Sequence, residues 1–261
     1  MITMDKHGVQ SIERAFSVIN ALSLAPAGTT LSELARMTGL NKSTVHRLLR
    51  SLIMMGYAAQ DEGTGKYHLT IRMFEVGSRV VNKLDVSMVS KPYLVRLSEV
   101  TGEAVHLVVR DGSDIVYILK EDSGSSSVRM SSRVGLRSPM YCTAVGKSIL
   151  AELPPEEVDK IWASSRIVKY TPNTVTSLEE LKEQLRTIRS RGYAIDDEEN
   201  ETGVRCVGAC LRDYSRKIVG AFSVSGPITR MDDSRIGEIA ELVLRTKKQI
   251  CSSLGYSQDT P

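Results

Sequence analysis

The stretch 39-GLNKSTVHRLLRSL-52 combines a leucine-rich pattern with small hydroxyl residues, a histidine and three cations. Asn41 is a residue type that favours the N-cap position, and Gly56 provides a stop. The spacing between them predicts a helix with one apolar face. The residues expected on its buried face are Val45, Leu48, Leu49, Leu52 and Ile53.

Two helical patterns precede this segment, and a hairpin pattern follows it. Residues 9–23 place apolar side chains at helical spacing, at Val9, Ile12, Phe16, Ile19 and Leu22. In residues 30–39, Thr30 and Glu33 have the spacing of a capping box, and Gly39 suits the left-handed position past a helix end. Residues 57–60 and 66–70 flank the turn-forming run DEGTG and read as two strands. This order predicts a winged helix-turn-helix.

The polar faces of the 41–53 helix carry side chains of the kinds that contact DNA. Hydroxyl and lysine groups reach phosphate oxygens, and arginine can donate two hydrogen bonds to guanine. A merely solvated helix face is the alternative, and the surrounding helix-turn-helix order favours DNA contact. The predicted DNA-binding residues are Asn41, Lys42, Ser43, Thr44, His46, Arg47 and Arg50, with Lys66 and His68 as candidates in the wing.

Length, composition and charge are consistent with this prediction. A chain of 261 residues suggests two domains, and 41% hydrophobic with 25% charged residues excludes general disorder. No apolar run reaches the roughly 20 residues of a membrane span, and the first residues lack a signal-peptide core, so we expect a cytoplasmic protein without a membrane partner. The whole net charge of +3 lies in residues 1–80, which is the sign that a phosphate-facing module requires.

The remainder of the chain alternates helical and strand patterns. Together these patterns predict an α+β protein with a winged helix-turn-helix in residues 1–70, a linker helix in 71–85 and a domain with an antiparallel sheet in 86–261. The helices of the last domain are expected at 86–102, 143–153, 155–165, 177–192 and 233–255, and its strands at 103–111, 115–122, 204–212 and 218–226.

Two of these strands carry small polar residues at alternate positions. Cys206, Gly208 and Cys210 share one face of their strand, and Ser223 and Ser225 share one face of the other. This pattern is typical of a small-molecule pocket lined by thiol and hydroxyl groups, although tight packing inside a sheet is the alternative.

The chain also contains an anion-binding candidate and an acidic cluster. The run TAVGK at 143–147 begins a predicted helix, whose free N–H groups favour a carboxylate. Asp196 is a candidate to accept hydroxyl groups of a ligand. The following Asp197, Glu198 and Glu199 are expected in a solvated acidic loop.

Several of these motifs, in this order, resemble the isocitrate lyase regulator (IclR) family of bacterial transcription factors. The segments concerned are 8–22, LSELARMTGLNKSTVHRLLRSLIMMGY, GKYHL, 138–153, 192–213 and 219–227, which span nearly the whole chain. The resemblance implies a winged helix-turn-helix, a linker helix and a GAF-like effector-binding domain, assembled as a homodimer or homotetramer on double-stranded DNA with palindromic operators.

The resemblance also implies which residues hold the effector. A carboxylate and its keto or hydroxyl group would be held by Ala144, Val145, Asp196, Cys206, Ser223 and Ser225, with Met130 as an apolar wall. The Ala144–Val145 pair replaces the Gly-Ala of some family members, which predicts a tighter or differently shaped pocket floor.

The sequence therefore predicts a DNA-binding regulator, a repressor of a catabolic operon that responds to a small organic acid such as a sugar acid or keto acid. We expect no catalytic residue and no resident metal or cofactor. We expect the four cysteines to be reduced thiols. One alternative is a redox- or metal-sensing regulator that uses Cys206 and Cys210. A weaker one is an enzyme in which Cys206 or Cys142 pairs with His106, or in which Asp196 and His106 bind a metal. HExxH, GxSxG and CxxC motifs are absent from the sequence.

Overall fold

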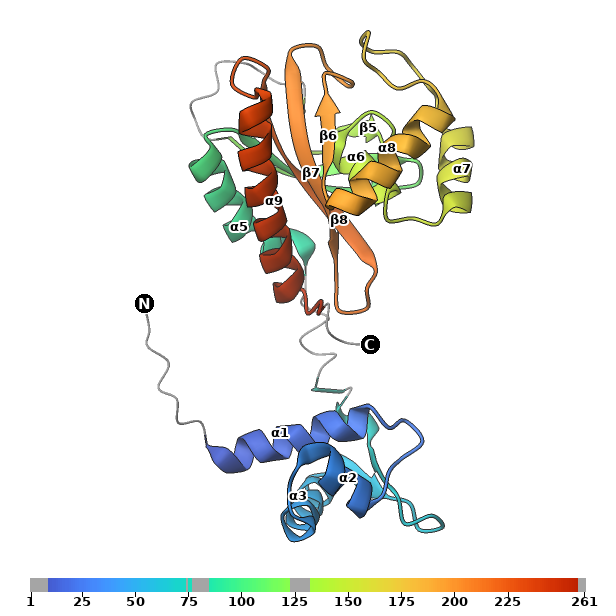
Figure 1. Ribbon diagram of the computed structural model, residues 1–261, viewed down its shortest axis with the longest axis vertical. Coiled ribbons are helices and arrows are strands. Elements are labelled where there is room, and N and C mark those ends of the chain that lie inside the picture. Colours follow the sequence, from blue (N-terminus) through green and yellow to red (C-terminus); the bar gives the residue numbers. More distant parts are fainter. Residues whose placement is uncertain (1–8, 74, 77–84, 123–131, 258–261) are drawn as a thin grey trace. The chain divides into compact units, whose positions relative to one another are not determined.

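The computed structural model describes residues 9–73, 75–76, 85–122 and 132–257. The chain divides into two compact units, Met1–Lys83 and Leu84–Pro261 (Figure 1). The domain boundaries expected after residues 70 and 85 stay predictions.

The N-terminal unit is a winged helix-turn-helix, which confirms the predicted fold of this part. Its hairpin pairs Ala58 with Leu69 and Gln60 with Tyr67, and a bridge between Thr29 and Tyr67 adds a short third segment. In chain order the elements are α1 (Gln10–Ser23), α2 (Leu31–Thr38), α3 (Lys42–Met54), β1 (Ala58–Gln60) and β2 (Tyr67–Leu69).

The turn between α2 and α3 forms for the local reasons that the sequence indicates. The Thr30 hydroxyl accepts a hydrogen bond from the Glu33 backbone N–H at 3.3 Å, which caps α2. Gly39 ends α2 with a φ of 67°, a left-handed conformation that favours glycine. Asn41 occupies the N-cap position of α3, but its side chain makes no capping hydrogen bond. The predicted N-cap position of Asn41 is therefore confirmed, whereas a capping hydrogen bond from its side chain is not formed.

The apolar faces of α1 and α3 differ in how well the prediction describes them. In α3, Val45, Leu49 and Leu52 are buried and Leu48 is half-buried, whereas Ile53 is exposed, so its predicted burial is wrong. In α1 the buried residues are Val18, Ala21 and Leu22, on the C-terminal half of the helix. The N-terminal half of the predicted stripe faces outward, with exposed fractions of 62% for Val9, 55% for Ile12 and 57% for Phe16.

The expected linker helix falls mainly outside the described residues. Residues 71–73 and 75–76 are helical, and residues 74 and 77–84 are not among those described.

The C-terminal unit contains a six-stranded antiparallel sheet in the order β5-β4-β3-β8-β7-β6, which confirms the α+β prediction. Figure 1 shows α5 and α9 over one face of this sheet and α6, α7 and α8 over the other. The strands are β3 (Ala104–Asp111), β4 (Asp114–Glu121), β5 (Arg137–Pro139), β6 (Ala194–Asp197), β7 (Val204–Arg212) and β8 (Ile218–Pro227). The helices are α5 (Val86–Thr101), α6 (Ala144–Leu150), α7 (Pro155–Ser164), α8 (Leu178–Arg191) and α9 (Asp233–Ser253).

Two apolar cores hold the sheet between its helices. Leu97 of α5 and Ile239 of α9 pack with Leu107 and Phe222 on one side, and Ile149 of α6 packs with Val108 on the other. Alternate strand residues therefore point into different cores, as the period of two requires. Among the described residues, no helix is both long and apolar enough to span a membrane.

Candidate effector cavity and DNA-contacting helix

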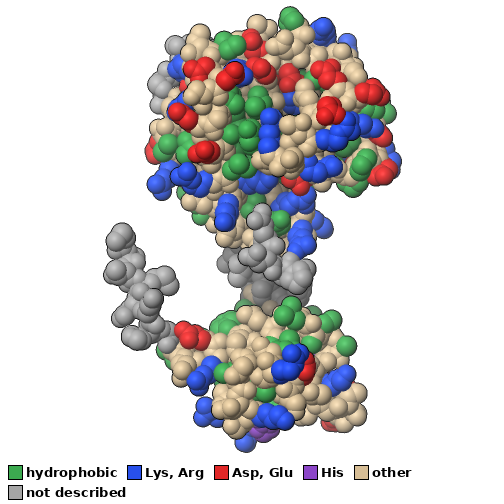
Figure 2. Space-filling model, in the orientation of Figure 1, with side chains coloured by type: hydrophobic (Ala, Val, Ile, Leu, Met, Phe, Trp, Pro, Cys, Tyr) green, Lys and Arg blue, Asp and Glu red, His purple; other side chains and the backbone are tan. Residues whose placement is uncertain are grey.

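The exposed faces of α3 carry the residues that the sequence predicts for DNA contact. Asn41, Lys42, Ser43, His46, Arg47 and Arg50 are exposed, and Thr44 is half-buried. Figure 2 shows Lys, Arg and His side chains grouped at the α3 end of this unit. In the described part of the chain, no salt bridge engages Lys42, Arg47 or Arg50. These cations are therefore available to phosphates and base edges.

The wing candidates are less exposed. Lys66 and His68 are half-buried beside the hairpin turn, in which the Asp61 carboxylate accepts hydrogen bonds from the Thr64 backbone N–H and hydroxyl, both at 2.7 Å. This Asx-type contact fixes the turn. The turn thereby positions Lys66 immediately before β2.

The C-terminal unit encloses a small cavity between the sheet and the start of α6. Its volume is about 40 Å³, which is room for about three water molecules. Six of the seven predicted effector residues line it, and the seventh, Met130, lies outside the described residues. The lining residues are His106, Tyr117, Ser132, Leu136, Ser138, Thr143, Ala144, Val145, Asp196, Asn200, Glu201, Val204, Cys206, Ser223 and Ser225.

Strand register brings the sheet residues of the cavity together. Asp196 of β6 pairs with Cys206 of β7, which pairs with Ser225 of β8. Two residues further along, Ser223 pairs with His106 of β3. Because the two rows are separated by two residues, both point to the same face of the sheet.

A glycine lets α6 begin close against this face. A Cβ atom added to Gly208 would lie 3.0 Å from the Ala144 carbonyl carbon and 3.1 Å from the Val145 nitrogen. The Thr143 hydroxyl caps the helix by accepting the Gly146 N–H at 3.1 Å. The N–H groups of Ala144 and Val145 lie in the first turn, where the helix itself supplies no acceptor. Backbone donors and the Ala144 and Val145 side chains therefore form the cavity floor.

Asp196 is buried and holds the turn that follows β6. Its Oδ1 accepts the backbone N–H groups of Glu199 at 2.8 Å and of Asn200 at 3.3 Å. Burial raises the pKa of Asp196 to about 7, although the positive charge of Lys147 and these hydrogen bonds act in the opposite direction. The carboxyl group therefore changes its charge near neutral pH.

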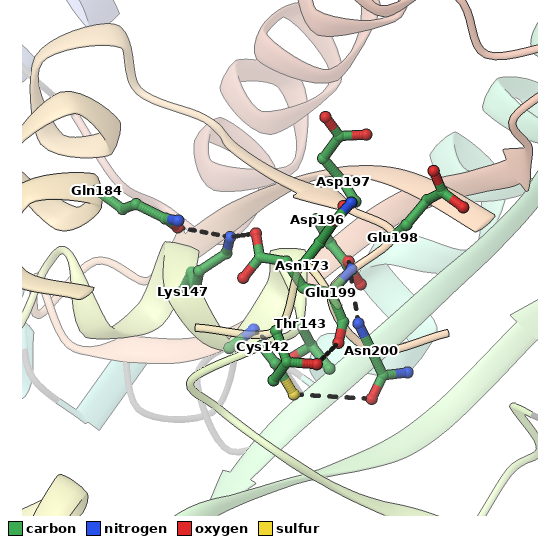
Figure 3. Close-up of polar contacts among 12 residues, drawn as sticks. Cys142, Thr143, Lys147, Asn173, Gln184, Asp196, Asp197, Glu198, Glu199 and Asn200 are labelled. Carbon is green, nitrogen blue, oxygen red and sulfur yellow. Dashed lines mark hydrogen bonds and ion pairs between the residues drawn. The ribbon is translucent and has the colours of Figure 1, made fainter. Parts of the chain in front are cut away.

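A buried ion pair lies beneath this turn, where the sequence predicts a solvated loop. Figure 3 shows the Lys147 ammonium between the Glu199 carboxylate and the Gln184 side-chain oxygen, the latter at 2.8 Å. The Lys147 and Glu199 side chains are only 1% and 6% exposed. Asp197 is exposed and Glu198 half-buried. The prediction of a solvated loop is therefore wrong for Glu199, because the Lys147 partner allows its burial.

His106 and Tyr117 are cavity residues that the effector prediction missed. His106 is 2% exposed, and its ring meets the Tyr117 ring edge-on at 5.4 Å between centroids. Burial, reinforced by the positive charge of Lys120, lowers the pKa of His106 to about 3, so the imidazole is neutral. The alternation of apolar residues in 103–111 places His106 on a buried face, and no sequence signal linked it to Ser223.

The cysteines do not form a reactive centre in the described structure. Cys206 and Cys210 are four residues apart in one strand, roughly 13 Å between Cα atoms, whereas a disulfide needs about 7 Å or less. Burial raises the pKa of Cys206 well above its usual value and that of Cys210 to about 12, which keeps both as thiols. Among the described residues, no hydrogen bond joins His106 to Cys142, and no group of three His, Cys, Asp or Glu residues could hold a metal.

Comparisons with known proteins place these two units in one family. Residues 11–62 match the IclR helix-turn-helix domain, and residues 78–252 match the domain described as bacterial transcriptional regulator IclR C-terminal. The chain belongs to the IclR family of transcriptional regulators. It is therefore a DNA-binding regulator rather than an enzyme, and the cysteine-dependent enzyme hypothesis is set aside.

Relatives cover nearly the whole chain. The regulator XynR and the transcriptional repressor IclR, both of Escherichia coli K12, are each 34% identical over 248 residues, which is 95% of this chain and 98% and 90% of theirs. The crystal structure of the Agobacterium tumefaciens repressor BlcR has a TM-score of 0.81 and 28% identity, and covers 96% of this chain and 99% of that one. The similarity to these proteins therefore extends over both units of the chain.

Proposed function

We propose that the chain represses a catabolic operon by binding a palindromic operator, and that a small organic acid in the cavity changes its affinity for DNA. Two of the three relatives named above are themselves called repressors. An effector that favours one arrangement of the protein shifts operator affinity, and DNA shifts effector affinity by the same factor.

The observation that carries this proposal is the convergence of six predicted effector residues on one cavity. Backbone N–H groups at Ala144 and Val145 can receive a carboxylate, and the Ser223 and Ser225 hydroxyls can bind a keto or hydroxyl oxygen. The volume of about 40 Å³ is small, so acids of two or three carbon atoms require less movement of the lining side chains than larger sugar acids do.

The outward apolar face of α1 supports a homodimer. Val9, Ile12 and Phe16 lie at helical spacing and expose more than half of their surfaces. A palindromic operator presents two half-sites related by a twofold axis, so two copies of α3 are needed to fill it. If two N-terminal units buried this face against each other, the resulting dimer would present two copies of α3, one for each half-site. A homotetramer would contain two such pairs.

A redox- or metal-sensing regulator is the second candidate that the sequence suggests. The separation of Cys206 from Cys210 along β7 and their raised pKa values argue against an intrachain dithiol switch. No specific observation favours this candidate over binding of an acid.

Replacement of Arg47 by alanine tests the DNA-binding half of the proposal. Because Arg47 is exposed on α3 and is not among the residues that line the cavity, we expect operator binding to weaken by about 1–3 kcal/mol, or roughly fivefold to 150-fold. The measurement is a gel shift with DNA from beside the gene of this protein. Stabilisation by small acids in a thermal-shift assay should be unchanged.

The matched control is Arg186→Ala, which removes an exposed arginine of α8 in the other unit. It should leave operator affinity as it is. Equal operator affinity of Arg47→Ala and the unmodified protein would show that α3 is not the recognition helix.

A further inference from the structure

His106 connects two hydroxyl groups of the cavity wall through its two ring nitrogens. Nδ1 lies 3.3 Å from the Ser225 Oγ, and Nε2 lies 2.8 Å from the Ser132 Oγ. Ser225 in turn lies 3.4 Å from the Ser223 hydroxyl. The result is a chain of four polar side chains, from Ser132 through His106 and Ser225 to Ser223, along one side of the cavity.

The two serines that contact His106 are themselves held in place. The Lys120 ammonium donates a hydrogen bond to the Ser132 backbone oxygen at 3.1 Å. Ser225 is 3% exposed and lies on β8, a central strand of the sheet. The imidazole between them is fixed by its contact with the Tyr117 ring. His106 therefore has two well-positioned partners and little freedom to choose others.

A neutral imidazole has one N–H donor and one nitrogen acceptor, so it gives its two partners opposite roles. If Nδ1 carries the proton, His106 donates to Ser225, and the Ser225 hydroxyl keeps its own proton to donate into the cavity, directly or through the Ser223 hydroxyl. If Nε2 carries the proton, His106 donates to Ser132 and accepts from Ser225. The Ser225 hydroxyl proton is then hydrogen-bonded to Nδ1 and cannot be donated to a ligand. The tautomer thus decides whether Ser225 offers a ligand a donor or only a lone pair.

This choice matters for the ligand class of the proposed function. A keto or aldehyde oxygen can only accept a hydrogen bond, whereas a hydroxyl group can donate as well as accept. A buried polar site that presents the wrong partner leaves a group unpaired, which costs about 1–3 kcal/mol. The polarity of the serine chain can therefore separate two acids that have the same carboxylate and the same number of carbon atoms.

We propose that His106 is a specificity-determining residue of the cavity, which fixes the direction of the Ser225 and Ser223 hydroxyls and so makes the site discriminate 2-oxo acids from 2-hydroxy acids. This inference rests on the proposed function of the cavity. The carboxylate itself is held elsewhere, at the start of α6. Loss of the imidazole nitrogens should therefore change the preference between the two acid classes more than it changes binding of a plain carboxylate.

The experiment measures calorimetric affinities of the full-length protein for glyoxylate and glycolate, pyruvate and lactate, and propionate. We expect the unmodified protein to distinguish the acids of at least one oxo and hydroxy pair by about tenfold. In His106→Phe, which keeps an aromatic ring but has no ring nitrogen, this ratio should fall to within about twofold of unity. Affinity for propionate should change by less than about threefold.

Ser132→Ala provides a second variant in case His106→Phe does not fold. It removes the partner of Nε2 and leaves Ser225 and the imidazole in place, so the oxo-to-hydroxy ratio should change by at least about threefold. Side-chain ¹⁵N chemical shifts of His106 should report the accompanying change of tautomer. These shifts would not move if Ser132 merely packed.

Two outcomes overturn different claims. Unchanged ratios in both folded variants would reject the role of His106 and leave the effector cavity intact. Failure of the unmodified protein to bind any of the five acids would reject both this inference and the small-acid effector on which it rests.

Discussion

Replacing Lys147 with methionine is expected to lower the free energy of unfolding of the C-terminal unit by about 3–5 kcal/mol. Lys147 is the cation that faces the buried Glu199 carboxylate, and Gln184 accepts its second hydrogen bond. The Glu199 Oε2 has no hydrogen-bond partner among the described residues. Without Lys147 the carboxylate would have no compensating charge, so it would need to take up a proton to stay buried. The loss should therefore grow as the pH rises.

Urea unfolding followed by tryptophan fluorescence measures this loss. Trp162 is the one tryptophan of the sequence and packs against Tyr141 in the C-terminal unit, so its signal reports this unit. Arg186→Ala is again the matched control, because it breaks an ion pair whose two side chains are 67% exposed and should cost less than about 1 kcal/mol. The double variant Lys147→Met with Glu199→Met should regain most of the stability. If Lys147→Met alone were as stable as Arg186→Ala, the Lys147–Glu199 pair would not be buried in solution.

The fold followed from the sequence wherever a strong period met clear boundaries. The N-cap Thr30, the left-handed Gly39 and the leucine spacing of α3 each predict the helix-turn-helix by local rules, and the structure contains it. The N-terminal half of the α1 stripe is helical as expected but is not buried, because periodicity shows which residues share a face but not whether that face is covered within the same chain. Phe16 is apolar and 57% exposed, so its own unit does not bury it.

Two strands escaped prediction for identifiable reasons. β6 is only four residues long and ends in Asp196 and Asp197, and aspartate is uncommon in strands. Its alternation of buried Asp196 with exposed Asp197 becomes visible only once β7 supplies the pairing. β5 has three residues and includes Pro139, which is tolerated because it is an edge strand.

The cavity shows the same division between local and long-range information. The period of two predicts that Ser223 and Ser225 share a face, and the family resemblance supplies the other effector residues. His106 lies more than 100 residues before Ser223, and only the pairing of β3 with β8 places them side by side. Lys147 similarly reads as the last residue of a helix N-terminal motif, and its burial depends on Glu199 reaching it across the fold. Such contacts are set by topology, which no local period encodes.

The charges around the cavity predict that a carboxylate effector binds together with a proton. Asp196 lines the cavity, and the nearby cation Lys147 is already paired with Glu199. Of the other groups facing Asp196, burial keeps His106, Cys206, Cys142 and Tyr117 in their neutral forms. A bound carboxylate and an ionised Asp196 would be two like charges in a site of low polarity, so binding favours protonated Asp196. Glu201 also lines the cavity, and its negative charge acts in the same direction.

The sign of the pH dependence follows from the pKa of about 7 for Asp196 in the free protein. Below that pH the proton is already bound, and pyruvate affinity should be nearly constant. Above it, affinity should fall by up to about tenfold per pH unit, or up to about 50-fold between about pH 7 and 9. Calorimetry in buffers of different ionisation enthalpy should show uptake of up to one proton per ligand. Asp196→Asn has no such proton to gain, so its affinity should stay constant. Its amide oxygen can still accept the Glu199 and Asn200 N–H groups, so the turn should be kept. An equally steep fall in Asp196→Asn would assign the proton to another group, with Glu199 the first to test because burial raises its pKa as well.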